Sequence, residues 1–328
     1  MKTPQFFQLH HEDGGEIRAE LLRGLQAAKA YTSPKYLYDA LGSKLFEAIC
    51  ELPEYYPTRT EAAIFAEHAQ SMASHIPQSA TLVDLGAGNC QKAACLFEAL
   101  QPSRYVAIDI SVDFLQDAMT RLQYQHPDLD MIGVGMDFAE SLAPPKEALE
   151  GTTPRVFFYP GSSIGNFTPD EALAFLQRIR TVCSASNQKQ GGLLIGVDLV
   201  KGKTELEAAY DDALGVTAAF NRNMLLHINC LIDSNFNILD WSHVALYNEQ
   251  LARIEMHLQA TRDVALRWSG YGETTTQRSF AKGERIHTEN SYKWTVDGFG
   301  DLLQNAGFAK PIVWTDVEQK FAVMWAAI

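Results

Sequence analysis

Basic residues, long apolar runs and cysteines are all scarce in this chain. Its 328 residues include 27 Lys and Arg against 40 Asp and Glu, which gives a net charge of −13. Nucleic-acid binding needs a basic surface that neutralises phosphates, and no cluster of Lys and Arg occurs. No apolar run approaches the roughly 18–20 residues of a membrane span, and the start, Met1-Lys2-Thr3-Pro4-Gln5, lacks the apolar region of a signal peptide. We therefore expect no nucleic-acid partner and no membrane association.

Metal-binding patterns are missing too. None of the nine histidines stands in H-x-x-x-H or H-E-x-x-H, and the five cysteines form no C-x-x-C. We therefore expect no metal. Five scattered cysteines are typical of reduced thiols in a cytoplasmic protein. One of them, Cys90, follows a glycine turn, but no neighbouring base would activate it, so we interpret it as a small structural residue.

Three short segments, each at the end of an apolar strand, predict an adenosine site. Val83-Asp84-Leu85-Gly86-Ala87-Gly88 is a strand that enters a Gly-x-Gly turn, and glycine lets the backbone approach a ligand closely. Asp109 ends the next strand, where a carboxylate can accept hydrogen bonds from two ribose hydroxyls. Asp137 ends a third strand and suits an adenine amino group, with Phe138 beside it to cover the base. The predicted cofactor-binding residues are Asp84, Gly86, Gly88, Lys92, Asp109, Asp137 and Phe138.

The residues after the two glycines indicate which adenosine ligand binds. A dinucleotide-binding turn reads G-x-G-x-x-G, with its third glycine at the helix that receives the pyrophosphate. Here Gln91 stands at that third position, and Lys92 follows at the expected start of a helix. A lysine there suits a ligand with a carboxylate, such as the methionyl arm of S-adenosylmethionine. The sequence thus predicts S-adenosylmethionine as the cofactor and argues against a dinucleotide-dependent dehydrogenase.

Strand and helix patterns alternate over residues 81–198, which predicts a parallel, doubly wound sheet. Thr168-Pro169-Asp170-Glu171 predicts a helix start with a capping box and Pro at the first helical position. The expected strands are Thr81–Leu85, Arg104–Asp109, Met131–Val134, Val156–Tyr159 and Gly192–Asp198.

The pattern changes after residue 198. One long helix is expected from Thr204 to about His227. A helix is expected again over Val296–Ala306, and Pro311–Trp314 with Phe321–Ile328 fits the closing antiparallel pair of a class I methyltransferase sheet. Between these helices, alternating segments predict an antiparallel sheet of Val244–Tyr247, Ile254–Thr261, Val264–Arg267 and Ile286–Trp294.

The expected fold class is therefore α/β, a class I (Rossmann-like) methyltransferase sheet, doubly wound, with a second, inserted α+β substrate domain. Residues 60–198 and 295–328 would form the S-adenosylmethionine-binding domain. Residues 15–59 and 199–294 would form the substrate-binding domain, which combines N-terminal helices with the insertion.

Motifs outside the glycine turn resemble the histidine-specific methyltransferase family, in the same order, from about residue 17 to the C-terminus. The turn itself reads G-A-G-N-C-Q-K where the family usually has G-S-G-T-S-E-K, so both glycines and the lysine are kept. The resemblance implies Nα-methylation of L-histidine to hercynine, the betaine precursor of ergothioneine. It rests on Tyr38–Phe46, Leu52–Glu61, Gly161–Phe167, Asp198–Lys201, Ala209–Ala213, Gly215–Asn223 and Ile254–Met256.

The resemblance also implies how the two ends of the amino acid are held. Asn166 and Tyr210 match residues that bind the substrate carboxylate. Gly161 and Tyr55 match residues near the α-amino group. Tyr38 or Tyr55 would relay the amine proton through water, and the sequence leaves that choice open.

The imidazole end is implied in the same way. Tyr38, Glu289 and Ser291 match residues that face the ring, and Met256 belongs to the same set of substrate-binding residues. The strand pattern agrees, because positions 289 and 291 project from one face of a strand. A carboxylate and a hydroxyl spaced in this way can address both imidazole nitrogens.

Other readings of the sequence remain open. The same reaction could act on another amino acid, such as tryptophan or tyrosine. Glu289 distinguishes this alternative from histidine methylation, because an acidic partner favours an imidazole over a purely apolar side chain. A non-catalytic S-adenosylmethionine-binding regulatory module is a third reading, but it would not need a second set of polar pocket residues. We expect a monomer that acts on a small-molecule amino acid.

Overall fold

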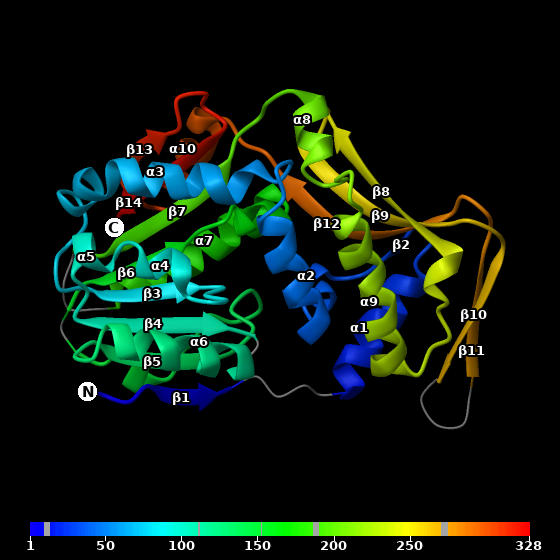
Figure 1. Cartoon of the computed structure of the whole chain (residues 1–328), viewed down its shortest axis with the longest axis horizontal. Coiled ribbons are helices and arrows are strands. Elements are labelled where there is room, and N and C mark those ends of the chain that lie inside the picture. Colours follow the sequence, from blue (N-terminus) through cyan, green and yellow to red (C-terminus); the bar gives the residue numbers. More distant parts are fainter. Residues whose placement is uncertain (10–13, 111, 152, 186–189, 270–274) are drawn as a thin grey trace. The chain divides into compact units, whose positions relative to one another are not determined.

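The computed structural model describes residues 1–9, 14–110, 112–151, 153–185, 190–269 and 275–328. Contacts divide the chain into two units, coloured by sequence in Figure 1. Within the described part, no helix is long and apolar enough to cross a membrane. The first unit contains Met1–His11, Pro57–Val200 and Trp294–Ile328, and the second contains Glu12–Tyr56 and Lys201–Lys293.

An eight-stranded sheet forms the centre of the first unit. Its strands are β1 (Gln5–Gln8), β3 (Thr81–Leu85), β4 (Arg104–Asp109), β5 (Asp130–Gly135), β6 (Arg155–Tyr159), β7 (Gly192–Asp198), β13 (Ile312–Thr315) and β14 (Phe321–Ala327). They lie in the order β1-β5-β4-β3-β6-β7-β14-β13. Only β14 and β13 run antiparallel to their neighbours. The expected doubly wound sheet, its five parallel strands and its closing antiparallel pair are therefore confirmed.

Helices and short helical turns flank this sheet and leave its central strands buried on both faces, as their continuous apolar sequences require. The expected capping box is present in α7, where Thr168 and Glu171 bond each other's backbone N–H groups. These elements are α3 (Tyr56–Ala73), α4 (Gln91–Ala94), α5 (Phe97–Leu100), α6 (Val112–Gln125), η2 (Lys146–Leu149), η3 (Ser163–Asn166), α7 (Pro169–Ser184) and α10 (Val296–Asn305).

The strand order reverses between β3 and β6. From β3 the chain proceeds to β4 and β5 on one side, whereas β6 and β7 lie on the other. At such a reversal the loops after two neighbouring parallel strands diverge, and ligands of α/β sheets bind in the crevice between them. The loops after β3 and β6 are therefore where the ligand site of this unit is expected.

The second unit packs helices against a four-stranded sheet of order β2-β12-β9-β8 (Figure 1). A separate pair, β10 with β11, forms a two-stranded ribbon. Helix α9 contacts α1, α2 and β8 and is the central helix of this unit. The elements are α1 (Gly14–Gln26), β2 (Ala30–Tyr31), η1 (Pro34–Leu37), α2 (Ala40–Cys50), α8 (Lys203–Ala208), α9 (Val216–Ile232), η4 (Ile238–Asp240), β8 (Trp241–Asn248), β9 (Arg253–Ala260), β10 (Val264–Ser269), β11 (Thr275–Phe280) and β12 (Arg285–Tyr292).

The single helix expected from Thr204 to about His227 is wrong. The chain forms α8 and α9 instead, separated by a loop that contains Asp212 and Gly215. The Asp212 carboxylate accepts hydrogen bonds from the N–H groups of Val216 and Thr217 at 2.9 and 2.7 Å and so begins α9. Gly215 has a φ of 75°, which ends any continuous helix at that point.

One further expectation needs correction. The segment Val264–Arg267 does not join the antiparallel sheet, because β10 pairs along its whole length with β11, a strand that was not expected from the sequence. The helix expected to begin near Lys92 is present as α4, which begins at Gln91 and is four residues long. Strands β1 and β2 were also not assigned, since each is short and pairs only at a sheet edge.

Candidate functional site: a glycine turn and a buried polar strand face

The Gly-x-Gly turn after β3 is tied to the end of β4. Gly86 and Gly88 have φ values of 70° and 52°, which few other residues adopt without strain. The N–H of Gly88 donates to Asp109 Oδ2 at 2.9 Å. A Cβ on Gly86 would lie 3.7 Å from the ring of Phe138. The turn, Asp109 and Phe138 are therefore brought together, as the sequence predicts.

Asp137 lies two residues beyond the end of β5, and not at the strand end as expected. Its Oδ1 accepts hydrogen bonds from the N–H groups of Ala139 and Glu140 at 3.0 and 3.2 Å, which orients the carboxylate. Phe138 packs edge-on against Tyr159, with ring centroids 5.8 Å apart. One carboxylate oxygen is thus occupied by the backbone, and Oδ2 makes no hydrogen bond to a described residue.

Lys92 is paired with an acidic residue that the sequence analysis quoted within a motif without assigning it a role. Its ammonium lies 2.8 Å from Glu61 Oε2, and the Glu61 side chain is 1% exposed. The second oxygen of Glu61 accepts the N–H of Gly161 at 2.7 Å. A Cβ on Gly161 would lie 2.9 Å from Lys92 Nζ, so a side chain at position 161 would displace the lysine ammonium. Glu61 thereby connects the first turn of α4 with the loop after β6.

Asp84 and Cys90 are buried beneath the turn. Tyr105 donates a hydrogen bond to Asp84 Oδ2 at 2.7 Å, and Oδ1 has no partner among the described residues. Burial raises the pKa of Asp84 to about 7. Burial likewise raises the pKa of the Cys90 thiol to about 12, which suppresses the reactive thiolate and supports its interpretation as a structural residue.

The loop after β6 presents Gly161 and Asn166. It is bent by positive φ values at Gly161 (77°) and Ser162 (57°), and the Ser162 hydroxyl accepts the N–H of Asp198 at 2.9 Å. Asn166 ends η3, is half-buried, and forms no side-chain hydrogen bond with a described residue. Its amide can therefore receive a polar ligand group.

In the second unit, one face of β12 is polar and buried. Glu289 and Ser291 lie two residues apart on it and are 7% and 4% exposed. Met256 of β9 lies directly opposite Glu289 in the antiparallel pairing and shares its face. No described residue donates a hydrogen bond to the Glu289 carboxylate. The pair predicted from strand alternation is therefore present, with Met256 beside it.

Lys293 continues this face and was missed from the sequence. It is 3% exposed, and its ammonium donates to Ser291 Oγ at 2.8 Å and to the Tyr210 hydroxyl at 3.0 Å. Tyr210 in turn donates to Ser291 Oγ at 2.7 Å. The alternation that indicated positions 289 and 291 extends to 293, so the same signal could have found it.

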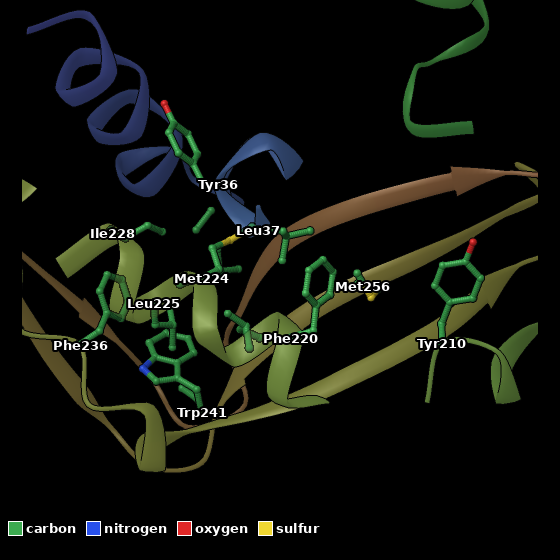
Figure 2. Packing of buried hydrophobic residues seen from close by; sticks show 14 of the residues in the cluster. Tyr36, Leu37, Tyr210, Phe220, Met224, Leu225, Ile228, Phe236, Trp241 and Met256 are labelled. Carbon is green, nitrogen blue, oxygen red and sulfur yellow. The ribbon is translucent and has the colours of Figure 1, made fainter. Parts of the chain in front are cut away.

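Aromatic rings line the same unit in a continuous series. Centroid distances are 6.2 Å from Tyr210 to Tyr55, 6.2 Å from Tyr55 to Phe46, 5.6 Å from Phe46 to Tyr38 and 5.5 Å from Tyr38 to Phe220. Figure 2 shows Phe220, Met256 and Tyr210 one after another along the strands of the sheet. The series gathers the predicted residues Tyr38, Tyr55 and Tyr210 and adds two phenylalanines.

Burial governs the ionisation of this cluster. It raises the pKa of Glu289 to about 7, and the charge of Lys293 opposes that shift. Burial also raises the pKa of Tyr55 well above its usual value, with further contributions from Tyr210, Cys50, Tyr38 and Glu289. Tyr55 therefore stays protonated near neutral pH. Among the described residues no group of three or more His, Cys, Asp or Glu could hold a metal ion.

Comparison with known proteins identifies similar chains. Residues 17–328 match the family described as "Histidine-specific methyltransferase, SAM-dependent". The chain is 36% identical over 322 residues to a histidine N-alpha-methyltransferase of Mycobacterium tuberculosis, covering 96% of this chain and 97% of that one. The corresponding protein of Mycolicibacterium smegmatis is 35% identical, covering 94% of each. An N-methyltransferase of Aspergillus flavus is 26% identical, covering 94% of this chain and 87% of that one. A solved S-adenosylmethionine-dependent methyltransferase from Clostridium acetobutylicum is 10% identical, with a TM-score of 0.42, and covers 88% and 96% of the two chains.

Proposed function

The chain belongs to the histidine-specific, S-adenosylmethionine-dependent methyltransferase family, and we propose that it methylates the α-nitrogen of L-histidine, up to three times, to give hercynine. It is thus an S-adenosylmethionine-dependent N-methyltransferase. Relatives named ergothioneine biosynthesis protein 1, from Neurospora crassa and Schizosaccharomyces pombe, are each 31% identical to it, which supports a place in ergothioneine biosynthesis.

The buried pair Glu289 and Ser291 is the observation that supports histidine as the substrate. A carboxylate and a hydroxyl on one strand face, beside the apolar Met256, can each bond one nitrogen of an imidazole. A buried polar group without a partner costs about 1–3 kcal/mol, so this face favours a side chain that bonds both groups. Tryptophan or tyrosine would offer fewer bonds, and an amino acid of that kind remains the second candidate.

The first unit has features that fit S-adenosylmethionine. Gly86 and Gly88 leave the backbone of the turn open to a ligand, the Asp109 carboxylate bonds the turn, and Asp137 precedes Phe138, whose ring lies beside Gly86. We propose that Asp109 holds the ribose, that Asp137 and Phe138 hold the adenine, and that Lys92 lies near the methionyl carboxylate. The cofactor supplies a methyl group already activated by its sulfonium. We therefore assign cofactor binding to residues 60–198 and 295–328, and substrate binding to residues 15–59 and 199–294.

The residues of this chain are proposed to act by orientation. Asn166 and Tyr210 would bind the substrate carboxylate and Gly161 would lie near the amine, as the family resemblance implies. Tyr38, Glu289 and Ser291 would hold the imidazole. Fixing both ends of a small substrate aligns its nitrogen with the methyl group, and positioning of this kind accounts for up to roughly 7–11 kcal/mol of a barrier.

The amine must lose a proton before it can accept a methyl group. We propose that Tyr38 or Tyr55 relays that proton through water. The raised pKa of Tyr55 means that its hydroxyl stays protonated near neutral pH, so it would pass a proton on through hydrogen bonds and would not act as an anionic base. The five cysteines, all of them within the described residues, form no disulfide, which fits our proposal of a cytoplasmic enzyme, acting as a monomer on a small-molecule substrate.

An amino-acid panel with methyl-labelled cofactor tests this function. Histidine, tryptophan and tyrosine are incubated separately with the enzyme, and the products are resolved and fragmented by mass spectrometry. We expect mono-, di- and trimethylated histidine with every methyl group on the α-nitrogen. Methyl groups on the imidazole, or faster methylation of tryptophan or tyrosine, would contradict the proposal.

A further inference from the structure

A chain of hydrogen bonds in the second unit joins α9, β8 and the loop that carries Tyr210. The buried side-chain nitrogen of Asn221, Nδ2, lies 2.9 Å from Nδ1 of His243. On the other edge of the ring, His243 Nε2 lies 2.8 Å from the backbone carbonyl oxygen of Tyr210. Asn221 belongs to α9 and His243 to β8, whereas Tyr210 lies in the loop between α8 and α9. The imidazole of His243 therefore connects this loop to the sheet.

The partners of Asn221 determine the form of the His243 ring. The same Nδ2 lies 3.1 Å from the carbonyl oxygen of His257, and a carbonyl oxygen only accepts hydrogen bonds. An amide flip would bring Oδ1 against that carbonyl, so the nitrogen stays there and directs its second proton at His243 Nδ1. Nδ1 is then an acceptor, and the proton of the ring is on Nε2, where the Tyr210 carbonyl accepts it. Burial also lowers the pKa of His243, in keeping with a neutral ring.

Tyr210 is held at both of its ends. Its hydroxyl lies 2.7 Å from Ser291 Oγ and 3.0 Å from Lys293 Nζ, on the polar face of β12. Its backbone carbonyl is held by His243. A hydroxyl at the end of a long side chain is placed accurately only when the backbone that carries it is fixed as well. Tyr210 is one of the residues proposed to bind the substrate carboxylate.

We propose that His243, oriented by Asn221, is a positioning residue that fixes the backbone of Tyr210 and thereby places its hydroxyl where the substrate carboxylate binds. This inference rests on the proposed function and adds two residues that act through Tyr210. The carboxylate contact is made in the bound ground state and in the transition state alike, so its loss raises KM more than it lowers kcat. A side chain that only supports folding would instead reduce the amount of active enzyme and leave the KM of the folded fraction unchanged.

Two substitutions of His243 separate the roles of its two nitrogens. The amide of Gln reaches about as far as Nε2 and can donate to the Tyr210 carbonyl, whereas the shorter amide of Asn reaches only as far as Nδ1. We expect His243→Asn to raise the KM for histidine about tenfold, and His243→Gln to raise it less than about threefold, because only the first leaves the carbonyl without its donor. Both variants should bind S-adenosylhomocysteine with wild-type affinity. The exposed His75→Asn is the control for the substitution and should match wild type.

A double-mutant cycle tests whether His243 acts through Tyr210. Tyr210→Phe removes the hydroxyl and should itself raise the KM for histidine. If the His243 ring serves to place that hydroxyl, His243→Asn should raise KM no further in the Tyr210→Phe background. Nitrogen NMR of the histidine side chains gives a separate measurement on wild type, where His243 should show the neutral tautomer with its proton on Nε2.

The outcomes separate this inference from the proposed function. A wild-type chain that does not methylate histidine, or a Tyr210→Phe variant with an unchanged KM, would overturn the proposed function or its assignment of Tyr210. With both intact, equal KM values for His243→Asn and His243→Gln, or a fall in kcat at constant KM, would overturn the positioning role. A further rise of KM in the double variant would do the same. If thermal unfolding shows that His243→Asn does not fold, a wild-type spectrum of an imidazolium or of the Nδ1–H tautomer would still overturn the proposal.

Discussion

The carboxylate of Glu61 lies 2.8 Å from the ammonium of Lys92 and, through its other oxygen, accepts the N–H of Gly161 at 2.7 Å. One side chain of α3 thus fixes both the lysine after the glycine turn and the start of the loop after β6. From the sequence, Lys92 is expected to be a cation available to a carboxylate ligand. In the structure Lys92 forms an ion pair with Glu61, so a carboxylate ligand would bind next to this ion pair and not to an isolated cation.

Removal of the Glu61 charge should destabilise the first unit. Glu61→Gln keeps an acceptor for Gly161 but takes away the charge opposite Lys92. We expect the free energy of unfolding to fall by about 1–3 kcal/mol. Glu67→Gln, at an exposed site on the same helix, is the control and should change it by less than about 0.5 kcal/mol. Urea denaturation measures both, and equal values would mean that the ion pair is not stabilising.

Gly196 of β7 makes room for that carboxylate. A Cβ there would lie 2.0 Å from Glu61 Oε1, a distance that no relaxed structure tolerates. Gly196→Ala should therefore lower the unfolding free energy by about 1–3 kcal/mol or more, as overpacking does in a buried site. Gly300→Ala in α10, where the nearest atom would be 3.7 Å away, should be neutral or stabilising. Thermal unfolding of the two variants compares them, and similar melting temperatures would contradict the steric argument.

Asp109→Ala should weaken cofactor binding without unfolding the protein. The carboxylate is proposed to bond the ribose, and it already accepts the N–H of Gly88 in the turn. Loss of charge-assisted bonds costs about 1.5–3 kcal/mol, or roughly ten- to a hundredfold in affinity. Calorimetric titration with S-adenosylhomocysteine measures the change, with the exposed Asp117→Ala of α6 as the control. An unchanged dissociation constant would show that the ribose lies elsewhere.

Much of the first unit could be predicted because its strands are buried on both faces and read as apolar runs. Thr81–Leu85 and Gly192–Asp198 were predicted at their observed bounds. The second unit was harder. The break between α8 and α9 depends on the side chain of Asp212, which caps α9. A capping contact of this kind cannot be predicted from the periodicity of apolar residues. The sequence likewise does not show which strand β10 pairs with, and in the structure that strand is β11.

The candidate site shows the same division. The pair Glu289 and Ser291 could be predicted, since alternation places both on one face. The alternation also places Lys293 on this face, but the roles of Lys293 and Glu61 depend on contact partners that the sequence does not reveal. Their partners, Tyr210 and Gly161, are 83 and 100 residues away in the chain.

The buried Glu289 should make stability fall as pH rises. Burial raises its pKa to about 7 in the folded protein, from the usual value of 4.5. Between these values the native state binds more protons than the unfolded state, so the unfolding free energy decreases from about pH 4.5 to pH 7 and then levels off. The loss attributable to this one group is up to about 3 kcal/mol. Glu289→Gln should lack it, whereas the exposed Glu51→Gln should follow wild type. Denaturation at four pH values gives the unfolding free energy as a function of pH for each protein. The same pH dependence in wild type and in Glu289→Gln would refute the prediction.

Glu289→Ala should alter which amino acid is methylated more than it alters cofactor affinity. The carboxylate is proposed to accept a ring N–H of histidine. Removing it leaves that N–H without a partner beside Met256, at a cost of about 1–3 kcal/mol, and opens space for a larger apolar ring. Apolar pockets discriminate weakly between substrates, whereas sites that bond a polar group discriminate strongly. The ratio of kcat/KM for histidine to that for tryptophan should therefore fall about tenfold or more, with S-adenosylhomocysteine affinity unchanged. If both activities fall equally and the ratio stays constant, Glu289 supports the fold of β12 and does not recognise the imidazole.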